Sequence, residues 1–152
     1  MKTSVAGIEL IKWYSSFFDK ATALDTEGWY VIGWEHHAND ISEGTTITPE
    51  ESEELLEKDL LPIENWVNDH FQNMKQNEFD ALVSLVLHHG YLVRESELYK
   101  ALKSRNMPEI VKRWNMLAIY EGHESPETVC RRLSETCMFV GYIDLKWKPA
   151  SK

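Results

Sequence analysis

The stretch from residue 10 to residue 34 holds a carboxylate, Asp25, in a D-T-E-G turn among aromatic residues. A carboxylate can stabilise positive charge or exchange protons, and aromatic rings line carbohydrate and partner surfaces. Two serines, Ser15 and Ser16, precede this turn, and a serine hydroxyl is far too weak an acid to serve as a proton donor. Glu35 follows the turn region and is the carboxylate that we would test first as a substitute acid. The carboxylates near Asp25 are otherwise interpreted as solvated loop charges: Asp19, Glu27 and Glu35.

The histidines and cysteines do not form a metal-binding pattern. Adjacent histidines, such as His36–His37 and His88–His89, point apart on a helix, whereas metal sites favour histidines four residues apart on one face. We therefore predict no metal and no cofactor. Cys130 and Cys137 would lie two turns apart on one helix, roughly 10 Å, which is too far for a disulfide. They are predicted to be free thiols, buried in a helix and kept reduced.

The composition is typical of a globular protein and excludes several functions. Of 152 residues, 43% are hydrophobic and 27% charged, enough to build one core. The net charge of −9 gives no electrostatic reason to bind nucleic acid or an anionic membrane. No apolar run approaches the ~18 residues of a membrane span, and the N-terminus lacks the apolar region of a signal peptide. We therefore expect a cytoplasmic protein that leaves the cell by lysis or inside a larger particle.

The first third of the chain changes from helical to β patterning. Apolar periodicity predicts an amphipathic helix over 5–19. Aromatic and β-branched residues around the D-T-E-G turn predict a short hairpin or small sheet over 22–36. A polar loop is expected over 37–48.

The rest of the chain reads as a series of helices with clear start signals. The sequence "TPEES" predicts a capping box at the start of a helix, with Thr48 as the N-cap and the Glu51 side chain bonding back to the backbone N–H of Thr48. Pro62 is predicted to kink or split this helix. The later predicted helices are one from an Asn77 cap to Gly90, one over 97–104, one from Pro108 and one capped by Ser125.

This order of elements predicts an α+β fold, with a small β lobe near the N-terminus and a mainly helical remainder. We expect a single domain over residues 1–152. Within it, the first helix and β lobe span 1–46, the helical lobe spans 47–140, and a basic tail spans 141–152.

Several stretches, in this order, resemble the phage-type lysozymes and endolysins, the family 24 glycoside hydrolases. "GIELIKWY" is similar to their first helix, G-x-x-L-I-K-x-F-E-G, and "LDTEGWYVIGW" to their hairpin, Y-x-D-x-x-G-x-x-T-I-G-Y. Three later motifs of the family resemble "ITPEESEELLEKDL", "QNEFDALVSLVLHHG" and "SPETVCRRLSE". The resemblance covers roughly residues 5 to 140 and implies a lysozyme-like fold and cleavage of the glycan strand of peptidoglycan.

The resemblance also implies a catalytic Glu at the end of the first helix and an Asp and a Thr in the hairpin. The Glu position falls on Ser15 when counted from "LIK" and on Ser16 when counted back from "DTEG". The Asp position is Asp25, and the Thr position is Val31. Further residues at family positions are expected to border the cleft: Trp34, Glu35, His36 and His88. Of these, Glu35 and His36 stand where the family has G-H.

These departures lead to a prediction about activity. Glycoside hydrolysis needs a proton donor for the leaving oxygen and a second carboxylate, and only Asp25 is retained. We therefore predict a pseudoenzyme, a binding or structural module for peptidoglycan glycan or for a protein partner such as a component of a phage particle. The alternative is an active peptidoglycan muramidase, an endolysin, that uses Asp25 and a relocated acid such as Glu35.

Overall fold

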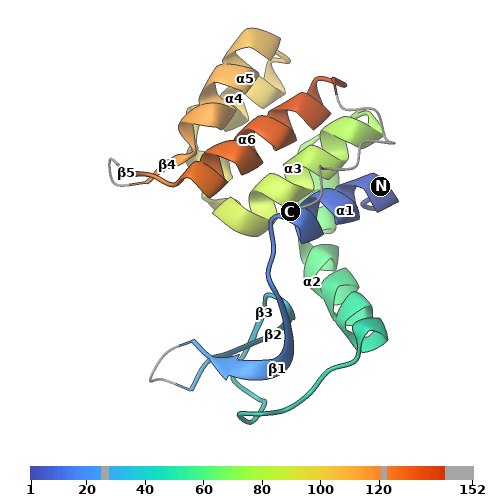
Figure 1. The fold of residues 1–152 in the computed structure, drawn as a ribbon. Coiled ribbons are helices and arrows are strands. Elements are labelled where there is room, and N and C mark those ends of the chain that lie inside the picture. Colours follow the sequence, from blue (N-terminus) through green and yellow to red (C-terminus); the bar gives the residue numbers. More distant parts are fainter. Residues whose placement is uncertain (25–27, 121–122, 143–152) are drawn as a thin grey trace. The chain divides into compact units, whose positions relative to one another are not determined.

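The computed structural model describes residues 1–24, 28–120 and 123–142, and the chain divides into two compact units (Figure 1). The β unit is Ser15–Pro62, and the helical unit combines Met1–Tyr14 with Ile63–Lys152. This division differs from the predicted lobes because the first helix belongs with the C-terminal helices. Most of the predicted tail, residues 143–152, lies outside the described residues. No helix among the described residues is long and apolar enough to cross a membrane.

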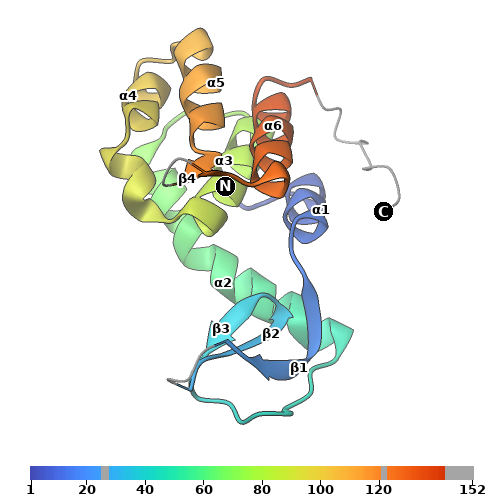
Figure 2. The same ribbon diagram turned by 60° about the vertical axis from the view of Figure 1, so that its left-hand side comes forward.

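The β unit contains a three-stranded antiparallel sheet, drawn in blue and cyan in Figure 2. Its strands are β1 (Phe17–Ala23), β2 (Tyr30–Trp34) and β3 (His36–Ala38), in that spatial order. In the register, Phe17 lies opposite Trp34 and Ile32 lies opposite His36. With helices forming most of the remaining structure, the predicted α+β class is confirmed.

The first helix, α1 (Val5–Trp13), is shorter than predicted. The helix expected over 5–19 is wrong beyond residue 13, because β1 begins at Phe17. The backbone N–H of Ser16 bonds to the side chain of Glu35, and Phe17 pairs with Trp34 across the sheet. These tertiary partners override the local helical periodicity.

The helix α2 (Pro49–His70) begins with the predicted capping box. The Thr48 N–H donates to Glu51 Oε2 at 2.8 Å, and the Glu51 N–H donates to Thr48 Oγ1 at 3.2 Å. The helix then continues without a break through Pro62, so the prediction that this proline splits it is wrong. The proline ring is exposed while the neighbouring Leu60 and Ile63 are buried, so packing of the inner face sustains the helix.

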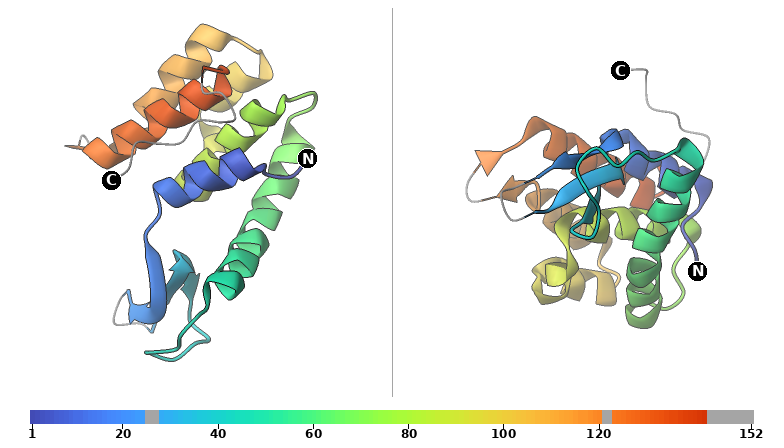
Figure 3. Two further views of the ribbon diagram at one scale, coloured as in Figure 1. Left: turned by 45° about the vertical axis from the view of Figure 1, so that its right-hand side comes forward. Right: turned by 90° about the horizontal axis from the view of Figure 1, so that it is seen from below.

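The helical unit is built around α3 (Gln76–His89), whose residues 78–86 are all buried. The capping residue is Lys75 rather than Asn77, whose amide instead donates to the carbonyls of Met138 and Phe139. Figure 3 shows α1 in blue and the last helix in red on either side of the green α3. The other elements are η1 (Tyr91–Glu95), α4 (Glu97–Lys103), α5 (Met107–Met116), β4 (Ile119–Tyr120), β5 (His123–Glu124) and α6 (Pro126–Phe139).

The two cysteines lie on α6 and are free thiols, as predicted, but both Cys130 and Cys137 are exposed. The prediction that they are buried is wrong because α6 turns a different set of residues inward. Arg131, Arg132 and Glu135 lie on its buried face, and both arginines pair with the Glu135 carboxylate.

Candidate active site

Glu35 has an unusual backbone for its residue type. It directly follows β2 and has a φ of 58°, in the left-handed region. This conformation costs an L residue with a side chain roughly 1–2 kcal/mol, and glycine adopts it freely. The resemblance to the phage-type lysozymes implies a glycine at this position, and this chain has a carboxylate there. A strained residue that is also exposed is a candidate for function.

The Glu35 carboxylate is held at the start of β1. Its Oε1 atom accepts a hydrogen bond of 2.9 Å from the backbone N–H of Ser16. Ser16 is exposed and Ser15 is half-buried. The Glu35 side chain is therefore tied to the backbone of Ser16, one of the two residues that sequence counting assigns to the family's catalytic Glu.

An aromatic pair lies one residue away on each strand. Phe17 and Trp34 are direct cross-strand partners, with ring centroids 5.0 Å apart and ring planes at 54°. Phe17 remains 41% exposed, and the half-buried indole of Trp34 donates its N–H to Glu53 Oε1 at 3.2 Å. Trp34 was among the predicted cleft residues. Phe17 was not, because its pairing with Trp34 depends on the strand β1, which the sequence did not predict.

The next residue of the chain anchors this region to α2. His36 Nδ1 lies 2.9 Å from both carboxylate oxygens of Asp59. Since β3 starts at His36, this contact holds the backbone immediately after Glu35. Val31, at the family's Thr position, is buried on β2 with 4% of its surface exposed. Asp25 lies outside the described residues.

His88, the remaining cleft candidate, belongs to the helical unit. Arg132 donates a hydrogen bond to its Nδ1 atom, and Arg132 also pairs with the buried carboxylate of Glu135. Burial, together with the positive charges of Arg131 and Arg132, lowers the pKa of His88 to about 4. Its imidazole is therefore neutral near pH 7 and forms part of a charged network.

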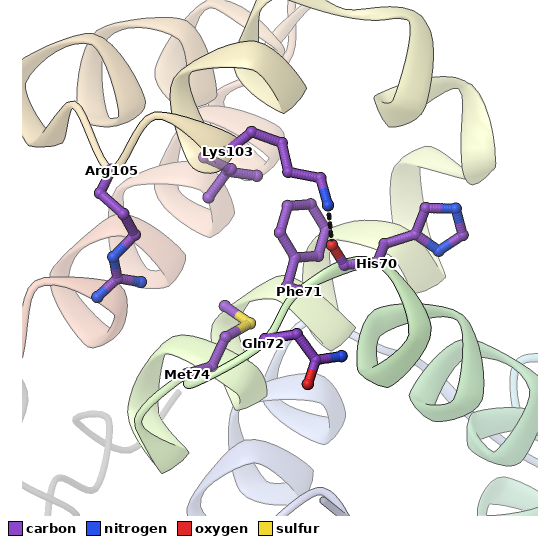
Figure 4. A pocket seen from close by; sticks show the side chains of 7 residues that line it. His70, Phe71, Gln72, Met74, Lys103 and Arg105 are labelled. Carbon is purple, nitrogen blue, oxygen red and sulfur yellow. Dashed lines mark hydrogen bonds between the residues drawn. The ribbon is translucent and has the colours of Figure 1, made fainter.

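A pocket of about 260 Å³ lies in the helical unit, and no sequence pattern predicted it. Figure 4 shows the Lys103 ammonium donating to the carbonyl of His70, beside the ring of Phe71. The Arg105 guanidinium makes a bidentate pair with Glu78, at 2.9 and 3.0 Å. Both cations are thus already engaged, and none of the predicted site residues lines the pocket. Among the described residues, no three His, Cys, Asp or Glu side chains could together hold a metal ion.

The chain is similar in sequence to known proteins. The family model for phage lysozyme matches residues 16–135. An endolysin of Bacillus phage PZA is 34% identical over 151 residues, which cover 91% of this chain and 55% of that protein. The chain thus spans about half the length of the curated relatives that it matches first.

Solved structures are similar to this chain as well. The muramidase domain of SpmX from Asticaccaulis excentricus has a TM-score of 0.82 and 31% identity, over 91% of this chain and 97% of that one. A variant of the P22 lysozyme has a TM-score of 0.79 and 28% identity, over 93% of this chain and 99% of that one.

These relatives correct the functional prediction. The expectation of a pseudoenzyme acting as a binding or structural module is contradicted, because the relatives found are endolysins, lysozymes and a muramidase domain. They give no support to a protein partner in a phage particle. The expectation rested on the residue types at positions 15, 16 and 31 alone.

Proposed function

Because the chain belongs to the phage lysozyme family, we propose that it is an active peptidoglycan muramidase, an endolysin, with Glu35 as a relocated general acid. The observation that carries this proposal is the bond between the Glu35 carboxylate and the Ser16 N–H. This bond ties a carboxylate to the backbone of a residue that one way of counting assigns to the family's Glu, and the side chain comes from the segment after β2. The strained φ of 58° at Glu35 supports a functional reason for a charged residue there.

The proposed reaction divides the work between two carboxyl groups. Glu35 donates a proton to the glycosidic oxygen as the bond to the anomeric carbon breaks. The Ser16 N–H then hydrogen-bonds the carboxylate that this transfer leaves. Asp25 is assigned the role of stabilising the positive charge that develops at the anomeric carbon. Since Val31 offers no hydroxyl, positioning of the attacking water also falls to Asp25 in this proposal, and the Asp25 carboxylate accepts the proton that the water loses as its oxygen bonds to the anomeric carbon.

The setting of the reaction follows from the same family membership. We propose that the substrate is the glycan strand of peptidoglycan, and that the protein is made in the cytoplasm and released at lysis. The net charge of −9 opposes attraction to anionic wall polymers, so recognition must rest on uncharged contacts with the sugar.

Purified insoluble peptidoglycan tests the proposal directly. Release of soluble fragments and of new reducing ends is measured from about pH 4 to pH 8, a span that covers shifted carboxylate pKa values. We expect the wild-type chain to release both, and Glu35→Gln to be slower by about 10²- to 10⁴-fold. Asp25→Asn is expected to be similarly impaired.

A matched control separates the acid from a general loss of charge. Glu43 is an exposed carboxylate of the same unit, in the loop before α2, and Glu43→Gln should keep wild-type activity. New reducing ends distinguish cleavage of the glycan from cleavage of the peptide cross-links. Absence of any release by the folded wild-type chain refutes the proposal. Full activity in Glu35→Gln refutes the role of Glu35.

A further inference from the structure

An aromatic pair, the exposed Phe17 and the half-buried Trp34, is next in sequence to Ser16 and Glu35, and we propose that the two rings form a stacking wall for a sugar ring. The ligand would be an N-acetylhexosamine unit of the glycan strand, next to the bond that is cleaved. This inference rests on the proposed function for its choice of ligand.

The aromatic pair is adjacent in sequence to Ser16 and Glu35. Phe17 directly follows Ser16, and Trp34 directly precedes Glu35, so the ring pair and the amide–carboxylate contact are adjacent along both segments of the chain. Consecutive Cα atoms are 3.8 Å apart, which is less than the length of one hexose unit. A glycan unit bound at the Glu35 carboxylate therefore has the aromatic pair within reach.

Phe17 is exposed and yet held in place by its neighbours. A phenylalanine that keeps 41% of its surface in water gains less from burial than one in the core. Its ring is nonetheless held, because it packs at 5.0 Å against Trp34, whose indole N–H is fixed by Glu53. An ordered and partly exposed ring loses little conformational entropy when it binds a ligand.

The chemistry of the rings selects the class of ligand. The face of a pyranose ring carries C–H groups that pack against aromatic rings, and this contact needs no charge on the protein. A chain of net charge −9 can use such a contact without repelling its substrate. The lysozyme pattern has glycine directly after its catalytic Glu, and this glycine falls on Phe17 when the Glu is counted back from "DTEG" to Ser16, or on Ser16 when it is counted from "LIK" to Ser15.

Binding in a catalytically silenced protein tests the wall separately from cleavage. The probe is tetra-N-acetylchitotetraose, titrated into the Glu35→Gln protein and followed by calorimetry and by the indole N–H signal of Trp34 in NMR spectra. Adding Phe17→Ala should weaken binding by about 3- to 10-fold, the range expected for one aromatic contact. Phe17→Leu keeps an apolar side chain in the strand and should also weaken binding. Tyr91→Ala, which removes an exposed ring of the helical unit, should leave binding unchanged.

The outcomes separate this inference from the proposed function. Binding that weakens in both Phe17 variants, with the Trp34 indole signal shifted by the ligand, supports the wall even if the wild-type chain cleaves nothing. The inference is overturned if the Glu35→Gln protein does not bind the oligosaccharide. It is equally overturned if Phe17→Leu, folded as judged by its spectrum, binds as tightly as the parent.

Discussion

An exchange between positions 16 and 35 tests whether the acid has moved from one strand to the other. The double variant Ser16→Glu with Glu35→Gly restores the arrangement of the lysozyme pattern, with the carboxylate before β1 and glycine after β2. Glu35→Gly alone removes the proposed acid. It should therefore lower activity by about 10²- to 10⁴-fold, and the exchange should recover at least about tenfold of that loss.

The effect on stability can be worked from the structure. Glycine at a φ of 58° relieves roughly 1–2 kcal/mol of backbone strain. The unfolded chain gains entropy that opposes folding by about 0.5–1 kcal/mol, and loss of the bond from Ser16 N–H costs about 0.5–1.5 kcal/mol. These terms nearly cancel, so the free energy of unfolding of Glu35→Gly should stay within about 1 kcal/mol of wild type.

Urea unfolding followed by tryptophan fluorescence gives the stability, and fragment release from peptidoglycan gives the activity. Ser15→Glu with Glu35→Gly is the control for the one-residue difference between the two ways of counting. The reasoning is refuted if Glu35→Gly keeps wild-type activity. It is also refuted if neither exchange variant exceeds Glu35→Gly although both are as stable as wild type.

Three further predictions concern stability and are measured by urea unfolding. Thr48→Ala removes the side-chain acceptor of the α2 capping box and should lower the free energy of unfolding by about 1 kcal/mol. His88 has a folded-state pKa of about 4 against 6.5 when unfolded, so the unfolded chain binds more protons and stability falls as pH drops from 6.5 to 4. The full shift corresponds to about 3 kcal/mol, which solvent screening of the partly exposed ring reduces to about 1 kcal/mol, and His88→Asn should abolish this loss. Glu135→Gln leaves Arg131 and Arg132 buried without their carboxylate and should cost about 3–5 kcal/mol; a loss below 1 kcal/mol would contradict the pairing.

Features that depend on neighbours in the chain could be predicted from the sequence. The α2 capping box needs only Thr48 and Glu51, three residues apart, and Ser125 caps α6 by the same local logic. The buried centre of α3 was visible because its apolar residues surround the helix on all sides. The family resemblance was visible because these local signals occur in the family's order.

Features that depend on distant partners could not be predicted. Residues 14–19 carry apolar side chains at helical spacing, yet Phe17 joins a strand because Trp34 lies opposite it. The positive φ of Glu35 has no signal in composition, since glutamate seldom adopts it. Only a comparison with the glycine of the family pattern could have pointed to a turn at that residue.

The proposed relocation of the acid follows from a simple property of antiparallel strands. Where two antiparallel strands meet, a residue at the end of one strand and a residue at the start of the other can each place its side chain in the same region. The lysozyme pattern has a Glu before β1 and glycine after β2. In this chain, Glu35 carries a carboxylate on the segment after β2, and the N–H of Ser16 donates a hydrogen bond to it. If the exchange variant is active, activity in this family depends on where the carboxylate oxygen lies, and a serine at the family's Glu position does not by itself identify an inactive member.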